Sequence, residues 1–367
     1  MKYYVIAGEA SGDLHGSNLI KQLQLSNPAA HIRCWGGDLM QATGAYLVKH
    51  YRDLAFMGFT EVIRNLPTIL GNLKFCKEDI ISYQPDVLIL IDYPGFNLRI
   101  AEWAKKQGFK VVYYIAPQVW AWKANRVKKM KTCIDLMLCI LPFEKDYFAQ
   151  QWNWDVHYVG HPLIEVIEKF KSVNQSEIKP IVALLPGSRK QEIAKKLPIM
   201  LSVATKFPQY EFVVAQAPGQ EDAFYEPFLE GQHNVKVVKD STYHLLSEST
   251  AALVTSGTAT LETALFGVPE IVCYKGSSIS YQIAKRLVKI KFISLVNLIM
   301  DKEIVKELIQ DELNTANLVR ELQFITSNPE KISELKSEYQ ELYTKLAGGG
   351  HASKNAAHLI MEFLQKM

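Results

Sequence analysis

The sequence predicts an α/β protein made of two doubly wound, Rossmann-like domains that face each other across a cleft, with a helical C-terminal segment. Short apolar segments typical of buried parallel strands recur along the chain and alternate with segments of helical periodicity. Two such runs of similar size follow each other, as expected for two domains. Several predicted strands end in small or polar residues before a helix, which is the edge where open α/β sheets bind ligands.

The composition fits a globular protein of this size. The chain has 367 residues, more than one domain usually contains, and 48% of them are hydrophobic. The net charge of +3 is too small to indicate a nucleic-acid partner. The five cysteines stand apart without any C-x-x-C spacing, which is typical of reduced thiols in a cytosolic protein.

No signal peptide or membrane-spanning segment is expected. The N-terminus passes from Met1-Lys2 directly into a predicted strand and then meets Glu9. No stretch approaches the roughly 18 uncharged apolar residues that a spanning helix needs. We therefore expect a cytoplasmic protein whose contact with a membrane is peripheral.

The first domain is expected over residues 1–165. Its predicted strands cover residues 3–7, 31–35, 45–48, 86–92, 111–115, 136–141 and 156–159. Residues 8–13 form a small, polar turn after the first strand and lack the G-x-G-x-x-G spacing of a dinucleotide site. This turn is therefore expected to face a ligand that is not a dinucleotide.

A carboxylate follows the clearest buried strand of this domain. Residues 87–91 are all apolar, and Asp92 comes directly after them. A carboxylate at the carboxyl end of a parallel strand projects into the ligand crevice, where it can act as a general base. It can equally cap the turn that follows, and the spacing alone does not decide between these roles.

Residues 54–73 are unusually apolar and are interrupted by Gly58, Pro67 and Gly71. They contain more large apolar side chains than one helix face can bury, among them Met57 and Phe59. Two interpretations remain open. The stretch is either a pair of short helices buried against the sheet or a surface that contacts lipid or an acyl chain.

Two tryptophans, Trp120 and Trp122, precede a basic run that includes Lys123, Arg126 and Lys128. Cations beside indole rings can bind a phosphorylated or lipid head group. Such a run is also typical of a solvated helix face.

The second domain is expected over residues 175–345, with strands at residues 181–185, 211–215, 235–238, 251–254 and 270–274. After Tyr274 the alternation is expected to give way to helices at residues 280–288, 302–309, 316–326 and 329–346. Gly348-Gly349-Gly350 predicts a flexible break. Residues 346–367 are then a separate segment that ends in a helix with an apolar face.

Two turns in the second domain have the composition of an anion site. Ser256-Gly257-Thr258 lies between a strand and a helix, so its backbone N–H groups stand at the positive end of that helix. Gly187-Ser188-Arg189 follows another strand, and the guanidinium of Arg189 suits phosphate oxygens. A lone glycine turn is often only a tight connection, but together these turns predict a diphosphate site. Glu262, one turn into the helix, is a candidate to bind a ribose diol.

No Asp-x-Asp motif and no cluster of His, Asp or Glu accompanies these turns. We therefore expect protein groups, not a metal ion, to neutralise the diphosphate. Such a site is typical of a nucleotide-sugar transferase with two Rossmann-like domains, and the region of Asn297 is expected to contribute to it.

Taken together, the motifs resemble those of the lipid-A-disaccharide synthase family. The matching segments occur in the family's order and span nearly the whole chain: residues 8–13, 91–97, 117–122, 138–144, 160–162, 185–189, 256–262, 297, 307–310 and 348–353. One departure is Gly95, where the family usually carries an acidic residue. This departure leaves Asp92 as the carboxylate of its motif.

The resemblance implies a glycosyltransferase of the GT-B fold. The implied reaction joins UDP-2,3-diacylglucosamine to 2,3-diacylglucosamine 1-phosphate (lipid X) and yields the β-1,6-linked lipid A disaccharide and UDP. It needs no cofactor, and it implies a peripheral location on the cytoplasmic face of the inner membrane. The oligomeric state stays open, with a homodimer as one alternative.

The resemblance also implies roles for the candidate residues in an inverting, metal-independent transfer. Asp92 is the expected base that takes the proton of the acceptor's 6-hydroxyl. The expected contacts of the UDP-sugar donor are Gly187, Ser188, Arg189, Ser256, Gly257, Thr258, Glu262 and Asn297. The residues expected near the acceptor and its lipid are Glu9, Ser11, Met57, Phe59, Trp120 and Trp122.

Two rival classes of function fit some of these motifs. One is another UDP-sugar enzyme of this architecture, such as a UDP-GlcNAc 2-epimerase or a transferase with a soluble acceptor. The other is a nucleotide-sugar-binding module without catalysis. Residues 54–73 disfavour the first class because a polar acceptor gives no reason to keep an apolar surface accessible.

Overall fold

The computed structural model describes residues 1–54, 66–174, 176–277, 281 and 290–366. The chain divides into two compact units. The first unit combines residues 1–162 with residues 346–367, and the second comprises residues 163–345. The C-terminal segment, which the sequence alone assigns to neither domain, therefore belongs to the first unit.

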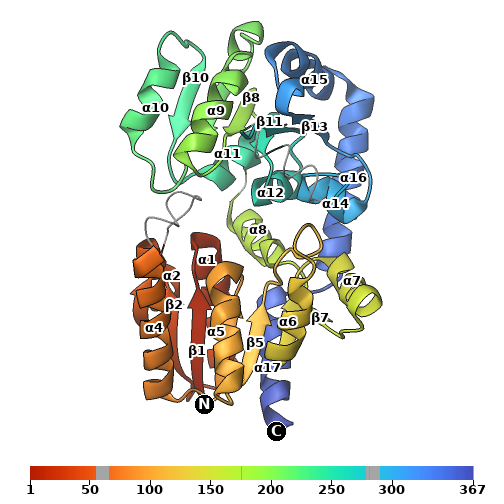
Figure 1. Ribbon diagram of the computed structural model, residues 1–367. Helices are drawn as coiled ribbons and strands as arrows, with labels where there is room; N and C mark the ends of the chain where they lie inside the picture. The colour runs from red at the N-terminus through yellow and green to blue at the C-terminus, as the bar shows by residue number, and fades with distance from the viewer. Residues whose placement is uncertain (55–65, 175, 278–280, 282–289, 367) are drawn as a thin grey trace. The chain divides into compact units, whose positions relative to one another are not determined.

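The described part of the first unit contains a seven-stranded sheet with the strand order β3-β2-β1-β4-β5-β6-β7 (Figure 1). All the paired neighbours are parallel. The strands are β1 (Lys2–Ala7), β2 (His31–Gly36), β3 (Tyr46–His50), β4 (Val87–Ile91), β5 (Val111–Tyr114), β6 (Leu136–Cys139) and β7 (His157–Tyr158). Because β1 lies between β2 and β4, the strand order reverses direction there, and such a switch point is where open sheets bind ligands.

Helices cover both faces of this sheet, and the side chains of β1 alternate between the two resulting cores. Tyr4 and Ile6 pack in one core with α4 (Leu66–Tyr83), α5 (Pro94–Lys106), α6 (Arg126–Cys133) and α7 (Pro142–Trp152). Tyr3 and Val5 pack in the other core with α1 (Ala10–Ser26) and α17 (Ala352–Gln365). Burial on both faces explains why the central strands read as continuous apolar runs. The short α2 (Asp38–Gln41) and the 3-10 turn η1 (Tyr51–Leu54) complete the unit.

The glycines before α17 serve close packing within the first unit. A Cβ atom on Gly160 would lie 2.4 Å from the carbonyl oxygen of Gly350, and one on Gly349 would lie 2.5 Å from the Cα atom of Gly160. The Asn355 side chain donates hydrogen bonds to the carbonyls of Val159 (3.1 Å) and Gly349 (2.6 Å). These contacts tie the glycines to the chain near Gly160, and flexibility at this break stays a prediction.

The second unit repeats the same topology. Its described sheet has six strands in the order β10-β9-β8-β11-β12-β13. The strands are β8 (Ile181–Leu185), β9 (Glu211–Ala215), β10 (Val235–Val238), β11 (Ala251–Thr255), β12 (Glu270–Tyr274) and β13 (Lys306–Ile309). The switch point lies between β8 and β11.

The helices of the second unit alternate with these strands until β12. They are α8 (Pro162–Val173), α9 (Lys190–Leu201), α10 (Asp222–Leu229), α11 (Thr242–Glu248), α12 (Thr258–Phe266), α14 (Leu295–Met300), α15 (Thr315–Ser327) and α16 (Pro329–Ala347). Two 3-10 turns, η2 (Ala204–Lys206) and η3 (Gln310–Glu312), lie between them.

The helix predicted at residues 302–309 is wrong, because Lys306–Ile309 forms the edge strand β13 and pairs in parallel with β12. Ile304, Val305 and Leu308 are buried, and their spacing fits a helix face as well as a short strand. The segment forms a strand because it can pair with the free edge of β12, and the local periodicity of the sequence carries no information about that edge.

Two predictions concern residues outside the described ranges. Met57 and Phe59 are among residues 55–65, and the helix predicted at residues 280–288 lies there as well, except for Tyr281. Of the apolar stretch, Leu54 and Leu73 are buried, whereas Leu70 on α4 is exposed.

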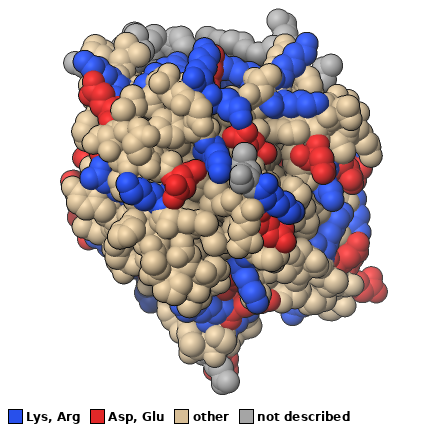
Figure 2. All heavy atoms as spheres, turned by 90° about the horizontal axis from the view of Figure 1, so that it is seen from below, with Lys and Arg blue, Asp and Glu red and all other residues tan. Residues whose placement is uncertain are grey.

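The surface shows no dominance of one charge on the face seen in Figure 2, where basic and acidic side chains are interspersed. Among the described residues, no helix has the length and apolar character needed to cross a bilayer.

Candidate functional site

The first part of the candidate site lies at the switch point of the first sheet. The turns that follow β1 and β4 meet there, and they carry Glu9 and Asp92 respectively. A Cβ atom on Gly8 would lie 2.3 Å from the ring of Tyr93, so only glycine allows this close approach. Ser11 is exposed at the start of α1, and Glu9 is half-buried just before it.

The backbone of Asp92 is held in an uncommon conformation. Asp92 and Tyr93 have φ angles of 44° and 49°, in the left-handed region that side chains other than glycine, asparagine and aspartate rarely adopt. The carbonyl oxygen of Asp92 accepts hydrogen bonds from Tyr113 Oη at 2.6 Å and from Asn97 Nδ2 at 2.8 Å. Strained backbone fixed by its surroundings is a feature of functional sites, because it holds a side chain in one place.

The electrostatics of Asp92 suit a base. Burial and the neighbouring Glu9 carboxylate raise the pKa of Asp92 to about 6, while a hydrogen bond from the backbone N–H of Tyr93 opposes the rise. A general base works best when its pKa lies near the working pH. Asp92 is therefore ionised near neutral pH and still basic enough to accept a proton.

Glu144, a carboxylate of the same unit on α7, is a further candidate that the sequence patterns did not single out. It is buried and accepts hydrogen bonds from the backbone of Leu141 at 2.9 Å and Ile140 at 3.2 Å, and from Trp120 Nε1 at 3.1 Å. Burial raises the pKa of Glu144 to about 7. Two signals in the sequence include it: the family-like segment 138–144, and its position three residues into a helix, which predicts a capping role.

The two tryptophans have different environments. Trp120 is anchored by Glu144 and packs edge-on against Phe143, with ring centroids 5.0 Å apart. Trp122 is 49% exposed, and its ring lies 4.1 Å from Lys123 Nζ and 5.7 Å from the guanidinium of Arg126. Trp122 and its cations are thus the part of this segment that is available to a partner.

The second part of the candidate site is a cavity of about 340 Å³ in the second unit. It is open at the carboxyl ends of β8, β9 and β11, next to the switch point of that sheet. It brings together most of the predicted donor residues and is lined by Leu185, Gly187, Ser188, Glu192, Ala215, Gln216, Ala217, Pro218, Thr242, Thr255, Ser256, Gly257, Thr258, Ala259 and Glu262.

The turn before α12 has the geometry expected of an anion cradle. Gly257 is the residue before the helix and has a φ angle of 148°, which favours glycine. The hydroxyl of Ser256 donates to the carbonyl of Ile293 at 2.7 Å and so fixes the turn. The first N–H groups of α12 have no partner within the helix, and they therefore attract an anion in the adjoining cavity.

Glu262 lines the same cavity and is held by a neighbour. Tyr243 Oη donates a hydrogen bond to Glu262 Oε1 at 2.9 Å. Burial raises the pKa of Glu262, and this hydrogen bond opposes the rise. Glu262 therefore presents a carboxylate to the cavity, and its contact with a ribose stays a prediction.

Arg189 does not line the cavity itself, although its neighbours Gly187 and Ser188 do. It stands just before α9, and its Nη1 atom is 3.5 Å from Glu192 Oε1. Glu192, which the sequence analysis did not single out, is part of the cavity wall. The described residues contain no group of three or more His, Cys, Asp or Glu side chains that could hold a metal ion.

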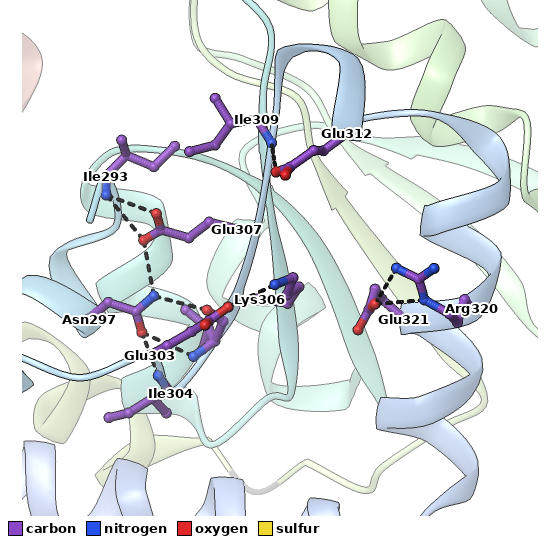
Figure 3. Close-up of polar contacts among 11 residues, drawn as sticks. Ile293, Asn297, Glu303, Ile304, Lys306, Glu307, Ile309, Glu312, Arg320 and Glu321 are labelled. Atoms are coloured by element: carbon purple, nitrogen blue, oxygen red, sulfur yellow. Dashed lines mark hydrogen bonds and ion pairs between the residues drawn. The ribbon is translucent and has the colours of Figure 1, made fainter. Parts of the chain in front are cut away.

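Asn297 joins α14 to the segment that leads into β13, and its predicted contact with the donor stays a prediction (Figure 3). Its side chain is fully buried. Nδ2 donates to the carbonyl of Val305 at 2.9 Å and to Glu307 at 3.0 Å, while Oδ1 accepts from Ile304 and Val305. These four hydrogen bonds use the donors and acceptors of the amide, so the Asn297 side chain fixes the entry into β13.

Solved structures share this fold over the whole chain. The UDP-GlcNAc 2-epimerase of Neisseria meningitidis bound to UDP-GlcNAc has a TM-score of 0.69 at 15% identity, with 100% of both chains covered. The glycosyltransferase of kitacinnamycin has a TM-score of 0.67 at 13% identity, with 98% of both chains covered. At these identities the likeness shows the fold alone, and that fold is GT-B.

Sequence relatives are more specific. The family model described as lipid-A-disaccharide synthetase matches residues 3–362. The lipid-A-disaccharide synthase of Trichlorobacter lovleyi is 36% identical over 374 residues, which cover 99% of this chain and 97% of that protein. Lipid-A-disaccharide synthase 1 of Legionella pneumophila is 35% identical over 356 residues, which cover 94% and 92%. The chain therefore belongs to the lipid-A-disaccharide synthase family of glycosyltransferases.

Proposed function

We propose that this chain transfers 2,3-diacylglucosamine from its UDP donor to the 6-hydroxyl of 2,3-diacylglucosamine 1-phosphate. The products are the β-1,6-linked lipid A disaccharide 1-phosphate and UDP. The observation that carries the mechanism is Asp92, a carboxylate at a sheet switch point whose raised pKa of about 6 suits a base.

In the proposed reaction, the oxygen of the acceptor's 6-hydroxyl attacks the anomeric carbon of the donor sugar. Its proton passes to Asp92, and the bond between the anomeric carbon and the phosphate oxygen breaks. The bonding electron pair leaves with UDP. Attack opposite the leaving group inverts the anomeric centre.

The second unit binds the leaving group in this proposal. The N–H groups at the start of α12, together with Ser188, Thr258 and Arg189, offset the negative charge that builds on UDP. Glu262 accepts hydrogen bonds from the ribose. The support for this assignment is the common cavity that these turns form.

An assay of UDP release tests the proposal. UDP should appear only when both the UDP-diacylglucosamine donor and lipid X are present. UDP release with a soluble acceptor, or epimerisation of UDP-GlcNAc, would assign the chain to another reaction. Tight binding of the donor without any turnover would indicate a binding module.

The predicted role of Arg189 can be checked by substitution. Arg189→Ala should weaken UDP binding by about tenfold or more, because a charge-assisted contact to phosphate is lost. Arg189→Lys should restore only part of the affinity, since a lysine lacks the planar fork. Uridine, which has no phosphate, is the control ligand, and calorimetry is the measurement. Equal losses for UDP and uridine would contradict a phosphate contact, and loss of activity with EDTA followed by rescue with Mg²⁺ would contradict the metal-free mechanism.

We also propose that the first unit contacts the cytoplasmic face of the inner membrane through Trp122 and its cations. An exposed indole with neighbouring lysine and arginine is suited to an anionic lipid interface, where each cation adds about 1 kcal/mol of attraction. Residues 54–73, which we predict either to contact lipid or to pack as two short helices, include residues 55–65, which lie outside the described residues.

The membrane proposal predicts the behaviour of Trp122→Ala. The variant should bind vesicles that contain anionic lipid several-fold more weakly, with UDP affinity unchanged, and salt should weaken the wild type further. Trp154→Ala is unsuitable as a control because Trp154 packs in the core, so the exposed Phe324→Ala in the second unit serves instead. Equal vesicle binding by wild type and Trp122→Ala in a sedimentation assay would rule out this contact.

A further inference from the structure

A buried lysine lies beside the proposed diphosphate cavity, and no role described so far uses it. Lys196 is on α9, and its side chain is 3% exposed. An ammonium group loses its hydration when it is buried, so lysines are rarely buried to this extent without a close partner. The carboxylate oxygen with which it pairs, Glu192 Oε2, is 4.0 Å away, which is beyond hydrogen-bond distance.

The ammonium group of Lys196 lies close to the turn Gly187-Ser188-Arg189. A Cβ atom on Gly187 would be 3.6 Å from Lys196 Nζ and 2.9 Å from Glu192 Oε2. Gly187 and Glu192 both line the cavity. The ammonium of Lys196 therefore lies close to two residues of the cavity wall, Gly187 and Glu192, although Lys196 itself does not line the cavity.

Glu192 is shared between two cations. Its Oε1 atom is 3.5 Å from Arg189 Nη1, while Oε2 faces Lys196. If Arg189 were the sole counter-ion of Glu192, the pair would be neutral and would offer a diphosphate no net attraction. With Lys196 the three side chains carry a net charge of +1. Burial lowers the pKa of Lys196, and the Glu192 carboxylate counteracts that effect.

We propose that Lys196 is a positioning residue for the donor diphosphate. It holds Glu192 when the nucleotide binds, so that Arg189 is free to exchange its carboxylate partner for phosphate oxygens. This inference rests on the proposed function and deepens it. Lys196 is then a second cation of the donor site, and its charge explains why the acidic Glu192 is tolerated in the cavity wall.

In this role Lys196 contributes to the binding of the diphosphate and does not contribute to the binding of the nucleoside. Without Lys196, the Glu192 carboxylate would compete with the diphosphate for Arg189. The affinity for UDP should then fall, whereas the affinity for uridine should not change. A lysine with a purely structural role would affect both ligands equally or only the stability.

The test is Lys196→Met, in which an unbranched apolar side chain replaces the ammonium. Removal of a buried charge in favour of an apolar group is often tolerated by the fold. We expect UDP to bind about tenfold more weakly, with an affinity that depends less on the salt concentration. The affinity for uridine should not change. Calorimetry measures both ligands. Lys195→Met is the matched control, because Lys195 is exposed on the same helix and its loss changes the net charge equally.

A second variant provides an independent check. In the double variant Glu192→Gln with Lys196→Met, the carboxylate of residue 192 no longer competes with the diphosphate for Arg189, so most of the lost UDP affinity should return. The proposal is overturned if Lys196→Met binds UDP as Lys195→Met does, if UDP and uridine are weakened alike, or if the double variant recovers nothing. If Lys196→Met does not fold, Lys196→Gln carries the same expectations. Failure of the wild type to bind UDP would instead overturn the proposed function.

Discussion

Asp92→Asn is expected to lower the turnover number by about two to four orders of magnitude, because an amide cannot accept the proton of the acceptor hydroxyl. The fold and UDP affinity should remain close to those of the wild type. Asparagine tolerates the left-handed backbone conformation that Asp92 adopts, and the two are nearly identical in shape. The measurements are steady-state turnover, UDP affinity and the thermal midpoint of each variant.

The pH dependence provides a second readout of the same substitution. Asp92 must be ionised to act, and its pKa is raised to about 6, so kcat/KM of the wild type should fall as the pH drops through about 6. The residual activity of Asp92→Asn should lack that decline. Asp53→Asn is the matched control, because it makes the same change at an exposed carboxylate of the first unit. If Asp92→Asn kept most of its activity, Asp92 would only stabilise its turn.

Gly160→Ala is expected to destabilise the first unit by about 3 kcal/mol or more. The new methyl group would lie 2.4 Å from the carbonyl oxygen of Gly350, and neither backbone can move without breaking the hydrogen bonds of Asn355. The φ angle of 92° adds a penalty for any side chain. The substitution therefore combines steric overlap with backbone strain.

Intrinsic fluorescence can follow the unfolding of this unit selectively, since all six tryptophans of the chain lie within residues 1–162. Gly108→Ala is the control: its φ angle is 84°, but a methyl group there would meet nothing within 4 Å. It should cost only the strain of a left-handed residue, about 1–2 kcal/mol. Equal urea midpoints for the two variants would mean that the glycine contact does not hold the C-terminal helix in place.

The strands that carry the site could be predicted from the sequence because they are buried on both faces. The continuous apolar runs of β1, β4, β8 and β11 predict buried strands without any knowledge of the tertiary structure. Their carboxyl ends, and with them Asp92 and the Ser256–Thr258 turn, follow from the rule for open sheets. Strand β13 could not be predicted in this way, because its short apolar pattern also fits a helix. It forms a strand because it pairs with the edge of β12.

The features that the sequence does not reveal depend on tertiary contacts. The hydrogen bonds from the Asn297 side chain to Val305 and Glu307 form only in the folded chain. The packing of Gly160 against the glycines before α17 likewise has no local signal in the sequence. Glu144 and Lys196 were missed since a charged residue on a helix is usually exposed, and only the fold shows that these two are buried.

The most direct test of the central claim is the structure of the product made from UDP-diacylglucosamine and lipid X. The account predicts one disaccharide 1-phosphate in which NMR shows a β-1,6 linkage, formed together with an equal amount of UDP. An α linkage would contradict direct displacement with Asp92 as the base. A product without a new glycosidic bond would contradict the transferase assignment itself.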